Sequence, residues 1–175
     1  MGFLEFLNYD FILTPLTEHT DIVAFLNPNQ MSRKEFYTIS NIKRNLDSLN
    51  KNLFFEFLKI MIFDALVGET DRHEENWGLT KKNNEYYISP LYDNGCSLLN
   101  KFKNEDYAQK YYQDNLLFEN YILKSKTYIY KENSSQRYKH FELIEYLIEL
   151  YPEEMKEEIK KLKELTNEKI EAIVN

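Results

Sequence analysis

The clearest pattern of apolar and polar positions along the chain lies between Leu53 and Val67. Apolar residues recur there three and four positions apart, and further apolar residues occupy the other side of the same helical projection. Such a pattern predicts an α-helix that is buried around most of its circumference. Gly68 follows at once, and a glycine in this position is typical of a helix that ends in the left-handed conformation.

Weaker patterns predict further elements before this helix. Residues 1–30 alternate short apolar runs with prolines, which indicates a loop with one or two short helices. Ser32 and Glu35 have the spacing of a capping box, in which the two residues satisfy each other's backbone N–H groups. We therefore expect one helix over Ser32–Ile39 and a second over Ser40–Leu49.

The segment after Gly68 predicts a polar loop and a small β-hairpin. The loop covers Glu69–Asn76 and is followed by two short runs of strand-forming residues, Trp77–Thr80 and Glu85–Ile88. The polar turn between these runs, residues 81–84, suits a hairpin connection. The fold expected from the whole pattern is mainly α-helical, with this one hairpin.

The last third of the chain predicts helices again. Residues 100–135 are polar and aromatic, and we expect a mixture of helix and loop there. From Tyr138 onwards the apolar positions have helical spacing to the end of the chain. Pro152 suits the first turn of a further helix, and Thr166 can cap a last short one.

Composition and charge set limits on the class of protein. The chain has 175 residues, of which 43% are apolar and 29% charged, as in a soluble globular domain spanning residues 1–175. The net charge of −7 argues against direct nucleic-acid binding, because neutralising phosphates requires a basic surface. For the same reason we interpret the aromatic residues at 107–130 as packing residues and not as a base-stacking surface.

The chain shows no sign of export or membrane insertion. Cys96 is the only cysteine, so an internal disulfide cannot form. No apolar run is long enough to cross a bilayer, and the first residues lack the pattern of a signal peptide. We expect a cytoplasmic bacterial protein without a membrane partner.

Three oxygen-bearing side chains around the predicted hairpin suggest phosphoryl-transfer chemistry. Asp71 and Asn76 lie five residues apart in the polar loop, and Asp93 follows the second predicted strand. Phosphoryl transfer from ATP needs a carboxylate that orients the attacking hydroxyl, and carboxylate and amide oxygens that hold Mg²⁺ against the phosphates. A hairpin that brings Asp93 back to the loop would gather these groups in one cleft.

The amino-acid sequences of these two segments resemble those of one kinase family. Gly-Glu-Thr-Asp-Arg-His-Glu-Glu-Asn at 68–76, followed by Ile-Ser-Pro-Leu-Tyr-Asp at 88–93, is similar to the HipA-type serine/threonine kinases. The resemblance implies a kinase C-lobe-like fold with Asp71 as the catalytic base, His73 as support for the catalytic loop, and Asn76 and Asp93 as ligands of Mg²⁺. It also implies ATP as phosphoryl donor, a protein as substrate, and a toxin–antitoxin system, with an antitoxin as partner, as one setting.

The resemblance covers the C-terminal lobe of a kinase only. A Gly-rich phosphate loop and a strand lysine complete a kinase, and neither is found before the Leu53–Val67 helix. We therefore expect a separate N-lobe subunit, and little or no activity from the chain alone. A pseudokinase-like interaction protein and a truncated, inactive fragment are the alternatives.

Other interpretations of the same residues stay open. Asp71 and Asn76 taken alone are typical of capped turns, and His73 is more typical of a structural loop histidine than of a catalytic one. Asp71, His73 and the glutamates beside them could also belong to a metal hydrolase. A hydrolase usually has several His ligands at fixed spacing, and His19 and His140 lie in unrelated contexts.

Overall fold

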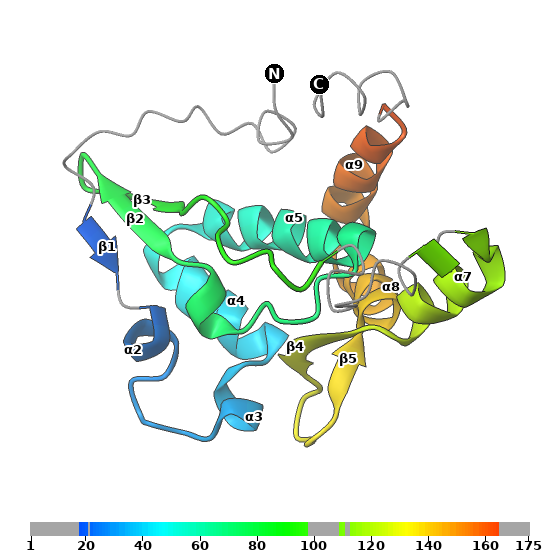
Figure 1. Ribbon diagram of the computed structural model, residues 1–175. Coiled ribbons are helices and arrows are strands. Elements are labelled where there is room, and N and C mark those ends of the chain that lie inside the picture. The colour runs from blue at the N-terminus through cyan, green and yellow to red at the C-terminus, as the bar shows by residue number, and fades with distance from the viewer. Residues whose placement is uncertain (1–17, 21, 98–108, 111–112, 165–175) are drawn as a thin grey trace.

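A computed structural model describes residues 18–20, 22–97, 109–110 and 113–164 of the protein (Figure 1). The helices are α2 (Ile22–Leu26), α3 (Arg33–Phe36), α4 (Ile39–Leu49), α5 (Lys51–Val67), α7 (Asn115–Lys124), α8 (His140–Leu150) and α9 (Pro152–Leu162), with a 3-10 turn, η1, over Glu74–Asn76. The strands are β1 (Glu18–Thr20), β2 (Leu79–Lys82), β3 (Glu85–Ile88), β4 (Lys126–Tyr130) and β5 (Arg137–Lys139). The prediction of a mainly helical protein with a small hairpin is confirmed, and the structure adds a second hairpin.

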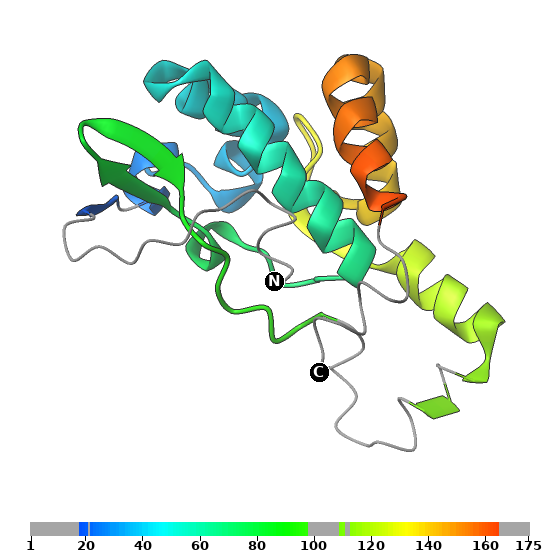
Figure 2. The same ribbon diagram turned by 90° about the horizontal axis from the view of Figure 1, so that it is seen from above.

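Helix α5 is the centre of the core. Its side chains Phe54, Phe57 and Leu58 are fully buried, and α4, α8 and α9 pack against it (Figures 1 and 2). The indole of Trp77 packs against Phe57, with 4.7 Å between the ring centroids. The strong apolar pattern therefore identified the element around which the domain is organised.

Both ends of α5 have caps. Asn50 accepts the backbone N–H of Asn52 at 2.9 Å, so the helix begins slightly before the predicted start at Leu53. At the other end Gly68 has φ +64°, and its N–H donates to the carbonyl of Asp64. The predicted left-handed cap at Gly68 is confirmed, and it turns the chain into the polar loop.

The segment before α4 is less helical than predicted. The capping box is present, because the carboxylate of Glu35 accepts the N–H of Ser32 at 3.0 Å. Helix α3 nevertheless ends at Phe36, and Tyr37 and Thr38 leave the helical conformation. Thr38 then caps α4 from its side chain, which explains the break between the two helices.

The predicted hairpin forms part of a three-stranded antiparallel sheet in the order β1-β2-β3. Leu79 of β2 lies opposite Ile88 of β3, and both are buried. The turn between them has Asn83 and Asn84 with φ +51° and +66°, which suits the tight turns that match the twist of a hairpin. Strand β1 was not predicted, because a three-residue strand carries too little pattern to recognise.

The second hairpin corrects the prediction for residues 100–135 and for the segment from Tyr138. Strands β4 and β5 pair antiparallel where helix and loop were expected. Thr127 and Ile129 of β4 are buried while their neighbours are half-buried or exposed, which is the alternation of a strand. That signal covers only five residues. Helix α7 fits the expected mixture.

The C-terminal helices are close to the prediction. Helix α8 begins at His140, after β5, and Pro152 occupies the first turn of α9 as expected. The cap predicted at Thr166 lies outside the described residues. Among the helices that the structure describes, none is both long and apolar enough to cross a membrane.

Candidate active site

The loop after α5 fixes the backbone of Asp71 from both sides. The buried carboxylate of Glu69 accepts the N–H of Asp71 at 2.7 Å. The carbonyl of Asp71 accepts two donors, the N–H of His73 at 2.8 Å and the side-chain amide of Asn76 at 2.7 Å. The five-residue step seen in the sequence therefore closes into a compact loop, in which the two predicted site residues contact each other directly.

The side chain of Arg72 anchors this loop to α5. Its guanidinium group lies 3.1 Å from Oδ1 of Asp64 and donates to the same carboxylate through Nε at 3.2 and 3.3 Å. Both side chains are 2% exposed, so the pair is removed from water. Burial raises the pKa of Asp64 to about 7, and the Arg72 guanidinium opposes this shift.

The remaining donors of Arg72 bring the segment after β3 to the loop. Nη1 donates to the carbonyl of Asn76 at 3.0 Å and to the carbonyl of Tyr92 at 2.8 Å. Nη2 also contacts Oδ1 of Asn94. One buried side chain thus bonds to Asn76 and to both neighbours of Asp93. Figures 1 and 2 show the segment after β3 running back towards the C-terminal end of α5.

The backbone of Asp93 adopts an uncommon conformation. Asp93 has φ +52° and is exposed. Asp and Asn tolerate the left-handed region better than most residues, and such conformations persist where the surroundings enforce them. Here the enforcing contacts are those of Arg72 on the two sides of Asp93. Further along, Sγ of Cys96 lies 3.9 Å from Oδ2 of Asp71, so the same segment also reaches the Asp71 carboxylate.

His73 lies at the start of η1. Its Nδ1 accepts the N–H of Glu75 at 3.2 Å, which caps the 3-10 turn. Its ring contacts Tyr128 of β4 edge-on, with 5.6 Å between centroids. These contacts join His73 to the 3-10 turn and to β4, and its role in supporting the loop stays a prediction.

The donor set fits Mg²⁺. The amide nitrogen of Asn76 is engaged with Asp71, so the amide oxygen is the atom left to bind a cation. Asp93 adds an exposed carboxylate. Among the described residues, no three His, Cys, Asp or Glu side chains gather to hold a metal unaided. Mg²⁺ commonly takes one or two protein oxygens and completes its shell with water and phosphate oxygens, so this set suits a metal–nucleotide complex.

Arg72, Asp64 and Glu69 hold the loop together, and none of the three was predicted as a site residue from the sequence. Asp64 could have been noticed in the sequence, because an acidic residue inside a helix that is apolar all round predicts a buried partner for its carboxylate. Nothing in the sequence tells which cation supplies it. The pairing of Arg72 with Asn94 joins residues 22 positions apart and follows only from the fold.

Comparisons with known proteins identify the fold and the family of the chain. The crystal structure of CtkA, a proinflammatory kinase of Helicobacter pylori, matches with a TM-score of 0.67 and 20% identity, over 90% of this chain and 57% of that chain. The chain thus has a kinase-like fold and spans little more than half the length of that kinase. The HipA-like C-terminal domain profile matches residues 19–170, and the chain belongs to this family. No curated protein matches the sequence significantly.

Proposed function

We propose that this chain is the catalytic C-terminal lobe of a HipA-like serine/threonine protein kinase that transfers a phosphoryl group from ATP. The supporting observation is the position of Arg72, which bonds to Asn76 and to both neighbours of Asp93. Together with the Arg72–Asp64 pair, these bonds connect a helix end, a loop and a strand end, and the loop and the strand end carry the residue types that phosphoryl transfer needs.

Each site residue has a separate task in this proposal. Asp71 orients the substrate hydroxyl and accepts its proton, and its backbone is fixed on both sides for that purpose. Asn76 and Asp93 would hold Mg²⁺, which neutralises charge on the transferred phosphate. His73 keeps the loop in shape through its bond to Glu75.

The transfer itself is proposed for an assembly and not for the chain alone. The phosphate-gripping loop and lysine of a kinase would come from an N-lobe that lies outside these 175 residues. The family resemblance also implies a protein substrate, an antitoxin partner and a bacterial cytoplasmic setting, which belong to the same proposal.

Metal–nucleotide binding by the chain tests the proposal without requiring turnover. Mn²⁺ can replace Mg²⁺, and its effect on water relaxation reports a protein-bound complex with ATP. Asp93→Asn is expected to weaken binding at least tenfold, because it removes the only charged ligand. Glu75→Gln is the matched control, since it removes an exposed charge from the same loop (side chain 66% exposed). Equal loss in both variants would refute the assignment of Asp93.

Activity of the complete assembly tests the role of Asp71. Removing a catalytic base commonly lowers the rate by about 10²–10⁴. Asp71→Asn is therefore expected to abolish phosphorylation while metal–nucleotide binding persists. Equal phosphorylation by the wild type and Asp71→Asn would exclude Asp71 as the base.

A further inference from the structure

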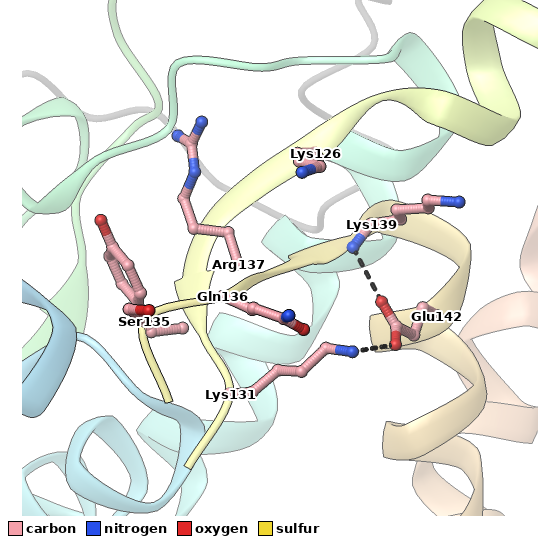
Figure 3. Close-up of a pocket in the computed structure, with 8 residues that line it drawn as sticks. Lys126, Lys131, Ser135, Gln136, Arg137, Lys139 and Glu142 are labelled. Carbon is pink, nitrogen blue, oxygen red and sulfur yellow. Dashed lines mark hydrogen bonds and ion pairs between the residues drawn. The ribbon is translucent and has the colours of Figure 1, made fainter. Parts of the chain in front are cut away.

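The second hairpin forms one wall of a pocket that the kinase chemistry does not use. The pocket has a volume of about 550 Å³ and lies between the β4–β5 hairpin and the start of α8 (Figure 3). Its volume is within the range of sites that bind small ligands or a few side chains. The residues that matter here are Lys126, Lys131, Arg137, Lys139, Gln136 and Glu142.

The lining of this pocket is cationic although the chain is acidic. Four of the lining side chains are Lys or Arg, and one is a carboxylate. Figure 3 shows that the carboxylate of Glu142 accepts hydrogen bonds from the ammonium group of Lys131 and from the backbone N–H of Lys139. In the described part of the chain, no ion pair joins the side chains of Lys126, Arg137 or Lys139 to an acidic residue. Among the described residues, the positive charge of the pocket is therefore only partly balanced, by Glu142, in a chain of net charge −7.

The register of the hairpin makes this charge unfavourable by itself. Lys126 of β4 lies directly opposite Lys139 of β5, and both are exposed. Like charges directly opposite each other on one face of a sheet destabilise the pair of strands. A bound anion between the two ammonium groups would remove that repulsion.

Contacts around one aromatic ring lead from the pocket towards the candidate active site, where Arg33 is paired with Glu74 at 2.8 Å. The guanidinium carbon of Arg137 lies 4.5 Å from the ring centroid of Tyr128, and that of Arg33 lies 5.6 Å from it. The same ring contacts His73, two residues after Asp71. A chain segment bound along the hairpin would therefore lead towards the hydroxyl-binding end of the site.

We propose that the hairpin pocket binds acidic side chains of a peptide segment whose serine or threonine is presented to Asp71. The proposal rests on the kinase function above and names its substrate class, which is proteins with Glu or Asp close to the phosphorylated residue. A nucleic acid is disfavoured, because a few cations on one hairpin neutralise few phosphates and the protein as a whole repels a polyanion.

Fluorescence anisotropy with the full chain tests the binding step. The probes are a labelled serine peptide that carries four glutamates and the same peptide with glutamines in their place. Lys126→Glu/Lys139→Glu is expected to weaken binding of the acidic peptide roughly tenfold, the effect of two lost charge contacts. The control, Lys156→Glu/Lys160→Glu, reverses two exposed charges on α9 and changes the net charge equally. It should stay within about twofold of the wild type.

Each outcome decides between the proposals. Equal binding of both peptides, or equal losses in the two double variants, would overturn the pocket as an acidic-peptide site. Duplex DNA that binds more tightly than the acidic peptide and is lost in the hairpin variant would replace the peptide by nucleic acid. Asp93→Asn should leave peptide binding unchanged, so failure of metal binding alone would overturn the kinase proposal, and with it the presentation to Asp71, but not the pocket as an acidic-peptide site.

Phosphorylation by the complete assembly tests the link to Asp71. The acidic peptide should be phosphorylated with a lower KM than the glutamine peptide, and the hairpin variant should remove that difference without lowering kcat. An unchanged preference in the hairpin variant would show that the pocket does not select the substrate.

Discussion

Replacing Arg72 by Met tests whether one buried guanidinium group both stabilises the fold and assembles the candidate site. Arg72→Met leaves Asp64 buried without its partner. Breaking a buried ion pair by removing one member costs about 3–5 kcal/mol. Burial raises the pKa of Asp64 and the Arg72 guanidinium opposes that shift, so removing Arg72 raises this pKa further and the isolated carboxyl takes up a proton at neutral pH. We therefore expect Arg72→Met to lower the free energy of unfolding by the lower end of that range, about 3 kcal/mol.

The double variant Asp64→Leu/Arg72→Met separates stability from site assembly. It removes both charges at once, and apolar replacements of buried ion pairs are often neutral for stability. We expect it to recover most of the free energy of unfolding. The bonds from Arg72 to the carbonyls of Asn76 and Tyr92 stay lost, so metal–nucleotide binding should remain weak in both variants.

Urea unfolding followed by tryptophan fluorescence measures the stability of all these variants. Trp77 is the only tryptophan of the chain and is fully buried, so its emission reports the core beside the loop. If the free energy of unfolding of Arg72→Met lies within about 1 kcal/mol of that of the wild type, the Arg72–Asp64 pair does not have the stabilising effect expected of a buried ion pair. A double variant as unstable as the single one would show that the carboxylate is not the source of the cost.

Three further substitutions test individual contacts by the same urea titration. Burial lowers the pKa of His140 from 6.5 to about 4, so as pH falls from 6.5 to 4 the wild type should lose up to about 3 kcal/mol relative to His140→Gln; a constant difference would refute this. Gly68→Ala should cost about 1–2 kcal/mol, because φ is +64°, and an unchanged midpoint would argue against strain. Tyr37→Phe removes the acceptor of the Trp77 indole N–H at 2.8 Å and should cost about 1–3 kcal/mol, whereas Tyr87→Phe, 46% exposed, should cost little.

Elements with strong local signals could be predicted from the sequence, whereas those that depend on distant partners could not. Helix α5, its glycine cap and the β2–β3 hairpin each follow from neighbouring residues, through apolar spacing, a left-handed glycine and a tight turn. Strand β1 exists because β2 offers it an edge about 60 residues later. Its three residues carry no pattern of their own.

The candidate site divides in the same way. The residue types and spacing of Asp71, Asn76 and Asp93 pointed to one site, because phosphoryl-transfer chemistry requires few groups. Their ligand and base roles stay predictions. The contacts that connect loop and strand end pass through Arg72, whose partner Asp64 lies on a buried helix face. No periodicity of the sequence identifies such a pairing.

Tyr37 connects the two regions for which separate binding roles are proposed. Its carbonyl accepts the N–H of Tyr130 at 3.0 Å, which attaches β4 to the body of the domain. Its hydroxyl group, deep in the core, donates to the carbonyl of Arg72 at 3.3 Å. Since a two-stranded hairpin is only marginally stable by itself, an occupant that restrained β4 would also slow local opening around Arg72. Slower amide hydrogen exchange in residues 69–76 would then report that the pocket beside β4 is occupied.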